Sequence, residues 1–94
     1  MNKTHNNLTI ENLMKTDWKN QFDREQLYQI KMGLESNVDV SIYARPEYKR
    51  IQMYEIREGL EQGLDVSKYA KPEIDGFDMG RIRYKLYLKQ NVDK

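Results

Sequence analysis

The sequence contains a tandem repeat. Residues 22–47 align without a gap to residues 48–73, and 14 of the 26 aligned pairs are identical. A third copy, 74–94, keeps the same spacing but is shorter and more divergent, whereas residues 1–21 do not match the unit. A unit this short cannot enclose a core alone. The chain is therefore expected to bury its apolar residues by stacking neighbouring units.

Each unit has the pattern of one amphipathic helix followed by a short turn. Apolar residues spaced three or four apart predict a single buried stripe, formed by Leu27, Ile30, Leu34 and Val38 in the first unit and by Met53, Ile56, Leu60 and Leu64 in the second. Asp23 and Gln26 resemble a capping box at the first helix start. Asn37 and Gly63 share one position, and both residue types adopt the left-handed conformation that closes a helix.

The segment that follows each helix, DVSxYA, is expected to form a helical turn or a tight irregular connector. Its caps could come from two pairs of side chains, Asp39/Asp65 or Ser41/Ser67. Pro46 and Pro72 are expected to stop this turn and to serve as the first residue of the next helix.

Two glycines recur inside the expected helices. Gly33 and Gly59 each cost about 1 kcal/mol relative to Ala in a helix interior. Their recurrence indicates that something packs closely against the backbone there. The simplest candidates are two pairs in the following turn, Tyr43/Tyr69 or Ala44/Ala70. Tyr43 and Tyr69 are therefore expected in the core. Tyr28 and Tyr54 are expected to pack between units, with a binding ladder as the alternative.

These patterns predict an all-α fold. We expect a short N-terminal capping helix over residues 1–21, followed by three stacked helix-plus-turn units, 22–47, 48–73 and 74–94, in one solenoid-like domain. A chain of 94 residues is too short for two ordinary domains.

The unit also carries a resemblance. Its pattern, Q-[LM]-Y-x-I-[KR]-x-G-L-E-x-[NG]-[VL]-D-V-S-x-Y-A-[RK]-P-E, resembles a short tandem repeat of largely uncharacterised bacterial proteins found on phages, plasmids and integrative elements. The match covers residues 22–73 well, 74–94 in part and 1–21 not at all. The resemblance supplies no catalytic residues. It implies an accessory protein of a mobile element that binds a host protein, such as a nuclease of a CRISPR or restriction system.

The residue types give little support for catalysis. The chain has no Cys, and His5 is its only histidine, in a polar N-terminal tail. Cysteine nucleophiles and Cys-ligated zinc are thereby excluded, and a histidine in a polar tail is expected to be solvated rather than part of a Ser-His-Asp set. Acidic residues recur with the unit, and basic residues recur in matching rows, so the acidic residues are expected to form ion pairs or helix caps. The acidic rows are Glu35/Glu61, Asp39/Asp65 and Glu47/Glu73, and the basic rows are Arg24/Arg50, Lys31/Arg57/Arg83 and Arg45/Lys71. We therefore expect no enzyme activity, no cofactor and no metal.

Charge and hydropathy restrict the class of partner. Sixteen basic and fifteen acidic residues leave a net charge of +1, which disfavours a general nucleic-acid coat protein. No apolar run approaches the length of a membrane span, and the polar N-terminus does not resemble a secretory signal. The sequence predicts a soluble cytoplasmic protein without membrane contact.

The third unit departs from the pattern on one face. Met79, Ile82 and Leu86 continue the core stripe, but a second apolar-aromatic stripe lies on the opposite side with basic residues around it. The residues expected to bind a partner are Tyr84, Tyr87 and Leu88 as anchors, with Arg81, Lys85 and Lys89 at the rim. A terminal unit normally keeps a polar outer face, so this stripe requires a cover.

Three covers remain open on sequence grounds. The N-terminal segment could fold back over the stripe, another protein could bind it, or nucleic acid could contact its basic rim and tyrosines. We expect non-enzymatic binding and inhibition of a host protein, such as a nucleoprotein defence complex in the manner of an anti-CRISPR or antirestriction protein. The alternatives are a small nucleic-acid-binding protein and a structural homo-oligomer, a homodimer being the simplest.

Overall fold

The structure is a computed structural model that describes residues 21–92. Along this part of the chain the elements are the helix α3 (Arg24–Glu35), the 3-10 turn η1 (Val40–Ile42), the helix α4 (Arg50–Glu61), the 3-10 turn η2 (Val66–Lys68) and the helix α5 (Gly76–Val92). No strand occurs within these residues, which confirms the all-α prediction. The helix expected over residues 1–21 lies outside the described residues, apart from Gln21.

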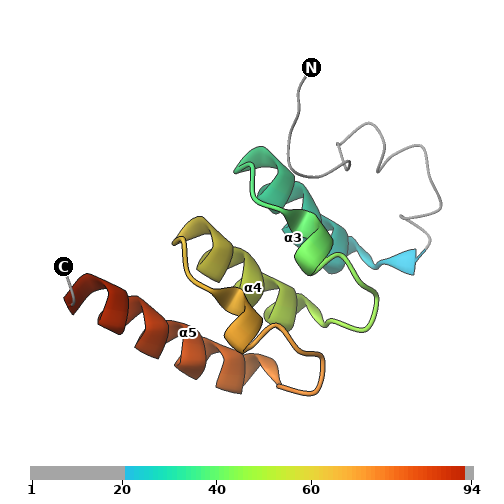
Figure 1. The fold of residues 1–94 in the computed structure, drawn as a ribbon. Helices are drawn as coiled ribbons and strands as arrows, with labels where there is room; N and C mark the ends of the chain where they lie inside the picture. The colour runs from blue at the N-terminus through green and yellow to red at the C-terminus, as the bar shows by residue number, and fades with distance from the viewer. Residues whose placement is uncertain (1–20, 93–94) are drawn as a thin grey trace.

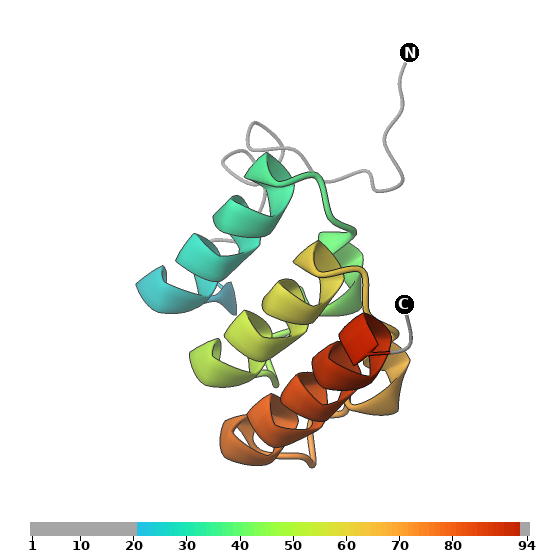
Figure 2. The same cartoon turned by 90° about the vertical axis from the view of Figure 1, so that its left-hand side faces the viewer.

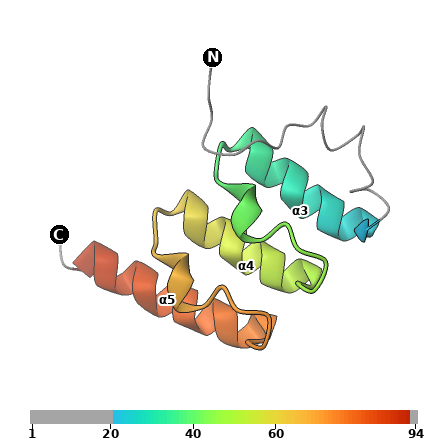
Figure 3. The same ribbon diagram turned by 45° about the vertical axis from the view of Figure 1, so that its right-hand side comes forward.

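The three helices lie side by side in one row, and the two 3-10 turns lie on one side of that row (Figures 1 and 2). The middle helix, α4, packs against both α3 and α5. Each connection leaves the end of one helix, makes its 3-10 turn and returns to the start of the next, so the helices all run in the same direction (Figure 3). No helix within residues 21–92 combines the length and apolarity needed to cross a membrane.

The helix starts follow the capping signals of the sequence. The Asp23 carboxylate accepts the Gln26 backbone N–H over 2.8 Å, and the Gln26 side-chain carbonyl accepts the Asp23 N–H over 2.8 Å. This is the expected capping box. Asp75 caps α5 through one such bond. Lys49 has no acceptor to offer α4, and Gln52 alone closes that start by accepting the Lys49 N–H over 2.8 Å.

The helix ends use the left-handed residue that the sequence predicts. Asn37 has φ 63° and Gly63 has φ 73°, so both positions reverse the chain. The Val38 N–H then donates to the Gly33 carbonyl over 3.0 Å, and the equivalent bond of the next unit, from Leu64 to Gly59, spans 2.9 Å. These bonds satisfy carbonyls that the helix end would leave unpaired.

The connections confirm one expectation and contradict another. Asp39 and Asp65 cap η1 and η2 by accepting backbone N–H groups, as one of the two alternatives requires. The expectation that Pro46 and Pro72 begin the next helix is wrong. Each stands second in a four-residue turn closed by a backbone hydrogen bond, and α4 begins only at Arg50. The fixed φ of proline suits this turn position as well as it suits a helix start.

The glycines inside α3 and α4 make room for tyrosines. A Cβ at Gly33 would meet the Tyr43 hydroxyl and would lie 2.6 Å from Val40 Cγ1. Gly59 has the same relation to Tyr69, and the Tyr69 hydroxyl donates to the Glu55 carbonyl over 2.6 Å. The tyrosine partner was therefore predicted correctly, and the alanine alternative was not needed.

The core runs through the row between the helices and the turns. Its fully buried side chains include Ile30, Tyr43, Met53, Ile56, Tyr69 and Met79. Two buried glutamines tie each helix start to the following connection. Gln52 donates to the Pro72 carbonyl over 2.9 Å and to the Ile74 carbonyl over 2.6 Å, and Gln26 makes the equivalent pair of bonds in the preceding unit.

The last helix is longer than the others. It has 17 residues, against 12 in α3 and in α4. Lys85 and Lys89 stand where α4 has Gly59 and Gly63. Because no turn interrupts α5 at residue 89, the helix continues to Val92. Without a left-handed residue at this position, nothing closes the helix there.

Candidate interaction surface on the last helix

The contact between α4 and α5 defines which side of a helix meets its successor. Gly76 of α5 lies against the Ile51 side chain, where a Cβ would clash. Arg83 Nε donates to Glu55 Oε1 over 2.7 Å, and Arg83 Nη1 donates to Gln62 Oε1 over 3.0 Å. Ile51, Glu55 and Gln62 therefore mark the side of α4 that faces α5.

The same side of α5 faces no further helix among residues 21–92. Adding 26 to the three contact positions of α4 gives Phe77, Arg81 and Leu88. Tyr84 lies between Arg81 and Leu88 on the same stripe, because residues three, four and seven apart share one side of a helix. We call these four residues, Phe77, Arg81, Tyr84 and Leu88, the α5 edge.

The α5 edge is both apolar and exposed. The exposed fractions are 75% for Phe77, 57% for Tyr84 and 42% for Leu88. A shallow hollow of about 500 Å³ begins beside the edge, over the α4–α5 contact, and Phe77, Arg81 and Tyr84 line it together with Ile51. Scattered exposed apolar residues are ordinary, but several on one helix side form a patch that characterises interaction sites.

The six residues expected from the sequence do not share one side of α5. Arg81, Tyr84 and Leu88 belong to the edge, and Lys85 is one turn from Arg81, beside it. Tyr87 lies one turn from Arg83, which bonds to α4, so its ring borders the α4–α5 contact and is 38% exposed. Lys89 is exposed one turn beyond Lys85, on the flank of the edge that lies away from Tyr87.

One residue of the edge escaped the sequence reasoning. Phe77 is the most exposed aromatic residue among residues 21–92, yet it precedes the segment in which the second stripe was sought. Its signal is visible in the repeat, where the equivalent positions hold Glu25 and Ile51. The change from Glu25 to Ile51 to Phe77, at a position that contacts the next helix, could have identified Phe77 as part of the edge.

The tyrosines of the first two helices correct one expectation. Tyr28 is 56% exposed and Tyr54 is 38% exposed, so their rings are not buried between units. The Arg57 guanidinium lies 5.5 Å from the centre of the Tyr54 ring, on the same helix. An aromatic ring one turn from an arginine can be stabilised at the surface by this contact.

Part of the basic charge of α5 is committed to internal pairing. The side chain of Arg83 is 18% exposed and is paired with Glu55. Burial alone would lower the pKa of Arg83, but the hydrogen bond and charge of Glu55 raise it on balance. The basic side chains that α5 offers outward are therefore Arg81, Lys85 and Lys89, all exposed.

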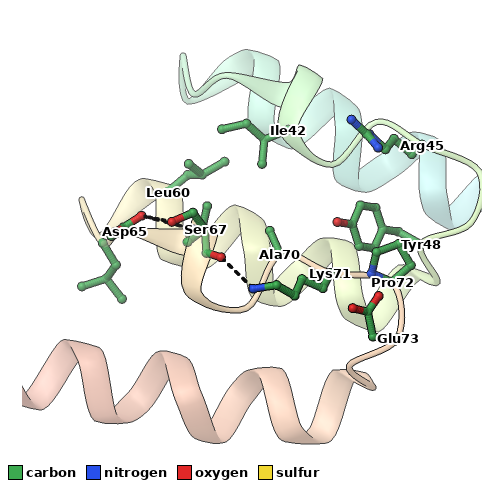
Figure 4. A pocket seen from close by; sticks show the side chains of 12 residues that line it. Ile42, Arg45, Tyr48, Leu60, Asp65, Ser67, Ala70, Lys71, Pro72 and Glu73 are labelled. Carbon is green, nitrogen blue, oxygen red and sulfur yellow. Dashed lines mark hydrogen bonds between the residues drawn. The ribbon is translucent and has the colours of Figure 1, made fainter.

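A second hollow lies between the two connections. This groove of about 650 Å³ has an apolar floor that includes Ile42, Leu60 and Ala70 (Figure 4). The polar groups at its rim serve the fold, because Asp65 accepts from Ser67 in the η2 cap. Those hydrogen bonds hold the pKa of Asp65 below its usual value. We place the candidate site on the α5 edge rather than in this groove, because the large exposed apolar side chains of α5 gather at the edge.

The described residues contain no group of three or more His, Cys, Asp or Glu side chains placed to hold a metal ion. The expected pairing of recurring acidic and basic residues is confirmed for Arg57 and Glu61 of α4, where Arg57 Nη1 lies 2.8 Å from Glu61 Oε2. Comparison with protein families, curated proteins and solved structures found no match to this chain.

Proposed function

We propose that this chain is a non-enzymatic module that binds another protein through the α5 edge. The observation that carries the proposal is the exposure of Phe77 and Leu88 at positions where α4 meets its neighbouring helix, with the exposed Tyr84 on the same stripe between them. Aromatic residues and Arg around an apolar centre are the composition enriched in protein interfaces. A helix side that meets only water would be expected to carry polar residues there.

The arrangement of the helices supports interpreting the chain as a short solenoid-like array. Equivalent hydrogen bonds recur from one unit to the next, as when Tyr43 donates to the Gln29 carbonyl and Tyr69 to the Glu55 carbonyl, both over 2.6 Å. In such arrays each unit contacts only its neighbours, and one side of α5 has no neighbouring unit among residues 21–92. That side is the α5 edge.

The resemblance of the repeat to mobile-element proteins supplies the biological part of the proposal. In this proposal the chain is a cytoplasmic accessory protein of a phage, plasmid or integrative element, and it inhibits a host protein such as a defence nuclease. The edge itself supports only that the partner is a protein. The host class rests on the resemblance.

Binding of nucleic acid is the competing function. It would use Arg81, Lys85 and Lys89, but Arg83 is tied to Glu55 and the net charge of the chain is only +1. Nucleic-acid binding weakens steeply with salt, roughly tenfold per tenfold salt for each phosphate contacted. An interface with an aromatic centre is expected to respond much less.

A capture experiment with matched variants tests the proposal. The tagged chain is incubated with nuclease-treated bacterial lysate, alongside the double variant Tyr84→Ala/Leu88→Ala and the control Tyr28→Ala. Tyr28 and Tyr84 are equally exposed, at 56% and 57%, but Tyr28 lies on α3, remote from the edge. We expect a protein to be retained by the unchanged chain and the control and lost from the double variant. Equal retention by all three, or retention only without nuclease, would refute the proposal.

A further inference from the structure

The α5 edge has the same chemistry when it is followed in either direction. Its four residues are symmetric about a point between Ile82 and Arg83. If a second α5 lay antiparallel across that point, Phe77 would stand opposite Leu88, and Arg81 would stand opposite Tyr84. The first pair is apolar against apolar, and the second places a guanidinium beside an aromatic ring. Each pair occurs twice in such an arrangement.

The charges beside the edge have the same antiparallel order. Asp78 lies near the start of α5, and Lys85 and Lys89 lie further along on the same flank of the edge, because the three are seven and four residues apart. Rotation about the two-fold axis brings this flank of one helix beside the same flank of the other. Asp78 of one copy then lies between Lys85 and Lys89 of the other, offset by about 3 Å along the axis from each.

A parallel pairing would lack these matches. In a parallel pair related by a two-fold axis along the helices, Arg81 would face Arg81 of the other copy. Like charges placed against one another in an interface disfavour that arrangement. The antiparallel arrangement also places the two helix dipoles in opposite directions, with the acidic start of each helix beside the basic end of the other.

We propose that the α5 edge binds a second copy of this chain, with the two α5 helices antiparallel and the two-fold axis between Ile82 and Arg83. The two rows of helices then join end to end. This inference rests on the proposed function, in which the same edge binds protein. One helix side forms a small interface, at the lower end of the range for specific complexes. A dissociation constant in the micromolar range, about 1–100 μM, is therefore expected.

Sedimentation equilibrium of the full chain from about 5 μM to about 500 μM tests dimer formation over the range around that constant. We expect a monomer–dimer equilibrium, weakened at least tenfold by Tyr84→Ala/Leu88→Ala and unchanged in the control Tyr28→Ala. Charge reversal gives a second, independent arm. Asp78→Lys is expected to weaken the dimer, and combining it with Lys85→Glu and Lys89→Glu is expected to restore it. Circular dichroism establishes that each variant is folded.

Engineered cysteines test the direction of the helices, because the natural chain has none. Chains with Phe77→Cys and chains with Leu88→Cys are mixed under oxidising conditions, at concentrations where both sediment as dimers. The antiparallel arrangement predicts disulfides between the two variants and few within either one. Disulfides formed mainly within each single variant, or none at all, would overturn it.

The failure of this inference is distinct from failure of the proposed function. If the chain remains monomeric at about 500 μM, or dimerises equally well as Tyr84→Ala/Leu88→Ala, the second copy is refuted as the occupant of the edge. The capture experiment can still show a different protein held by Tyr84 and Leu88. If that capture also persists in the double variant, both proposals fail.

Discussion

A single methyl group at Gly59 tests the packing that holds each helix to its connection. Gly→Ala in a helix interior ordinarily stabilises a protein by about 1 kcal/mol, because Ala has the higher helix propensity. At Gly59 the added Cβ would meet the Tyr69 hydroxyl and would lie 2.7 Å from Val66 Cγ1. Tyr69 is fully buried, so its ring has no free space into which it can move. We therefore expect Gly59→Ala to destabilise the chain.

The magnitude follows from three contributions. Overpacking of a filled core costs about 1–3 kcal/mol. Displacing the Tyr69 hydroxyl from the Glu55 carbonyl, now 2.6 Å away, costs a further ~0.5–1.5 kcal/mol. The gain in helix propensity offsets about 1 kcal/mol. The net loss in the free energy of unfolding is about 0.5–3.5 kcal/mol, and each kcal/mol lowers Tm by about 4–8 °C in a domain of this size.

Urea and thermal unfolding followed by circular dichroism measure this loss. Gly33→Ala, which meets Tyr43 in the same way, is expected to give a similar value. The matched control is residue 85, where α5 has no such tyrosine over it. There Lys85→Ala is expected to be more stable than Lys85→Gly by about 1 kcal/mol. The reasoning is refuted if Gly59→Ala raises Tm, or if Tyr69→Phe, which removes the nearest clashing atom, does not lessen the loss.

Three further predictions concern polar groups that form hydrogen bonds within the fold. Gln52→Ala leaves two backbone carbonyls of the second connection without their donor. Urea unfolding should therefore show a free energy of unfolding lower by about 1–3 kcal/mol. An unchanged free energy of unfolding would contradict the role of Gln52. Burial raises the pKa of Tyr43 and of Tyr69. The stability that the two neutral hydroxyls contribute is therefore present below about pH 10 and is lost as pH rises above it. The double variant Tyr43→Phe/Tyr69→Phe should flatten this alkaline loss of stability, measured by circular dichroism. Hydrogen bonds from Ser67 lower the pKa of Asp65. The variant Asp65→Ala should therefore be less stable than the unchanged chain at pH 7, and the difference in Tm should shrink as pH falls below about 3.8. A difference in Tm that does not depend on pH would contradict the cap.

Local signals predicted most of the helical architecture. The ends of α3 and α4 follow from Asn37 and Gly63, because few residues adopt positive φ at low cost. The tyrosine above each glycine followed from the expense of a glycine inside a helix. In each case a local physical constraint leaves few outcomes open, and for the glycines the structure selects the tyrosine over the alanine alternative.

Interactions between distant residues were not predictable in the same way. Gln52 has the pattern of a helix-start residue, and nothing local indicates that its amide reaches carbonyls of Pro72 and Ile74, in the following connection. The proline error has a related cause, because the fixed φ of proline suits both a turn and a helix start. Phe77 was missed because its exposure depends on the absence of a following helix among the described residues, and only the fold shows this.

The neighbours of α5 explain both a contact that it keeps from the repeat and an edge that departs from the repeat. On the side that meets α4, Arg83 keeps the role of Arg57. Each arginine donates through Nε to the equivalent residue of the preceding helix, over 2.7 Å in α5 and 3.0 Å in α4. On the opposite side the polar residues at the equivalent positions of α4, Glu58 and Gln62, have become Tyr84 and Leu88. If water were the only neighbour of that side, exposing two larger apolar side chains would lower solubility without a compensating contact. The kept contact of Arg83 is explained by the helix it touches, and the changed edge is explained in the same terms if a second protein surface lies against it.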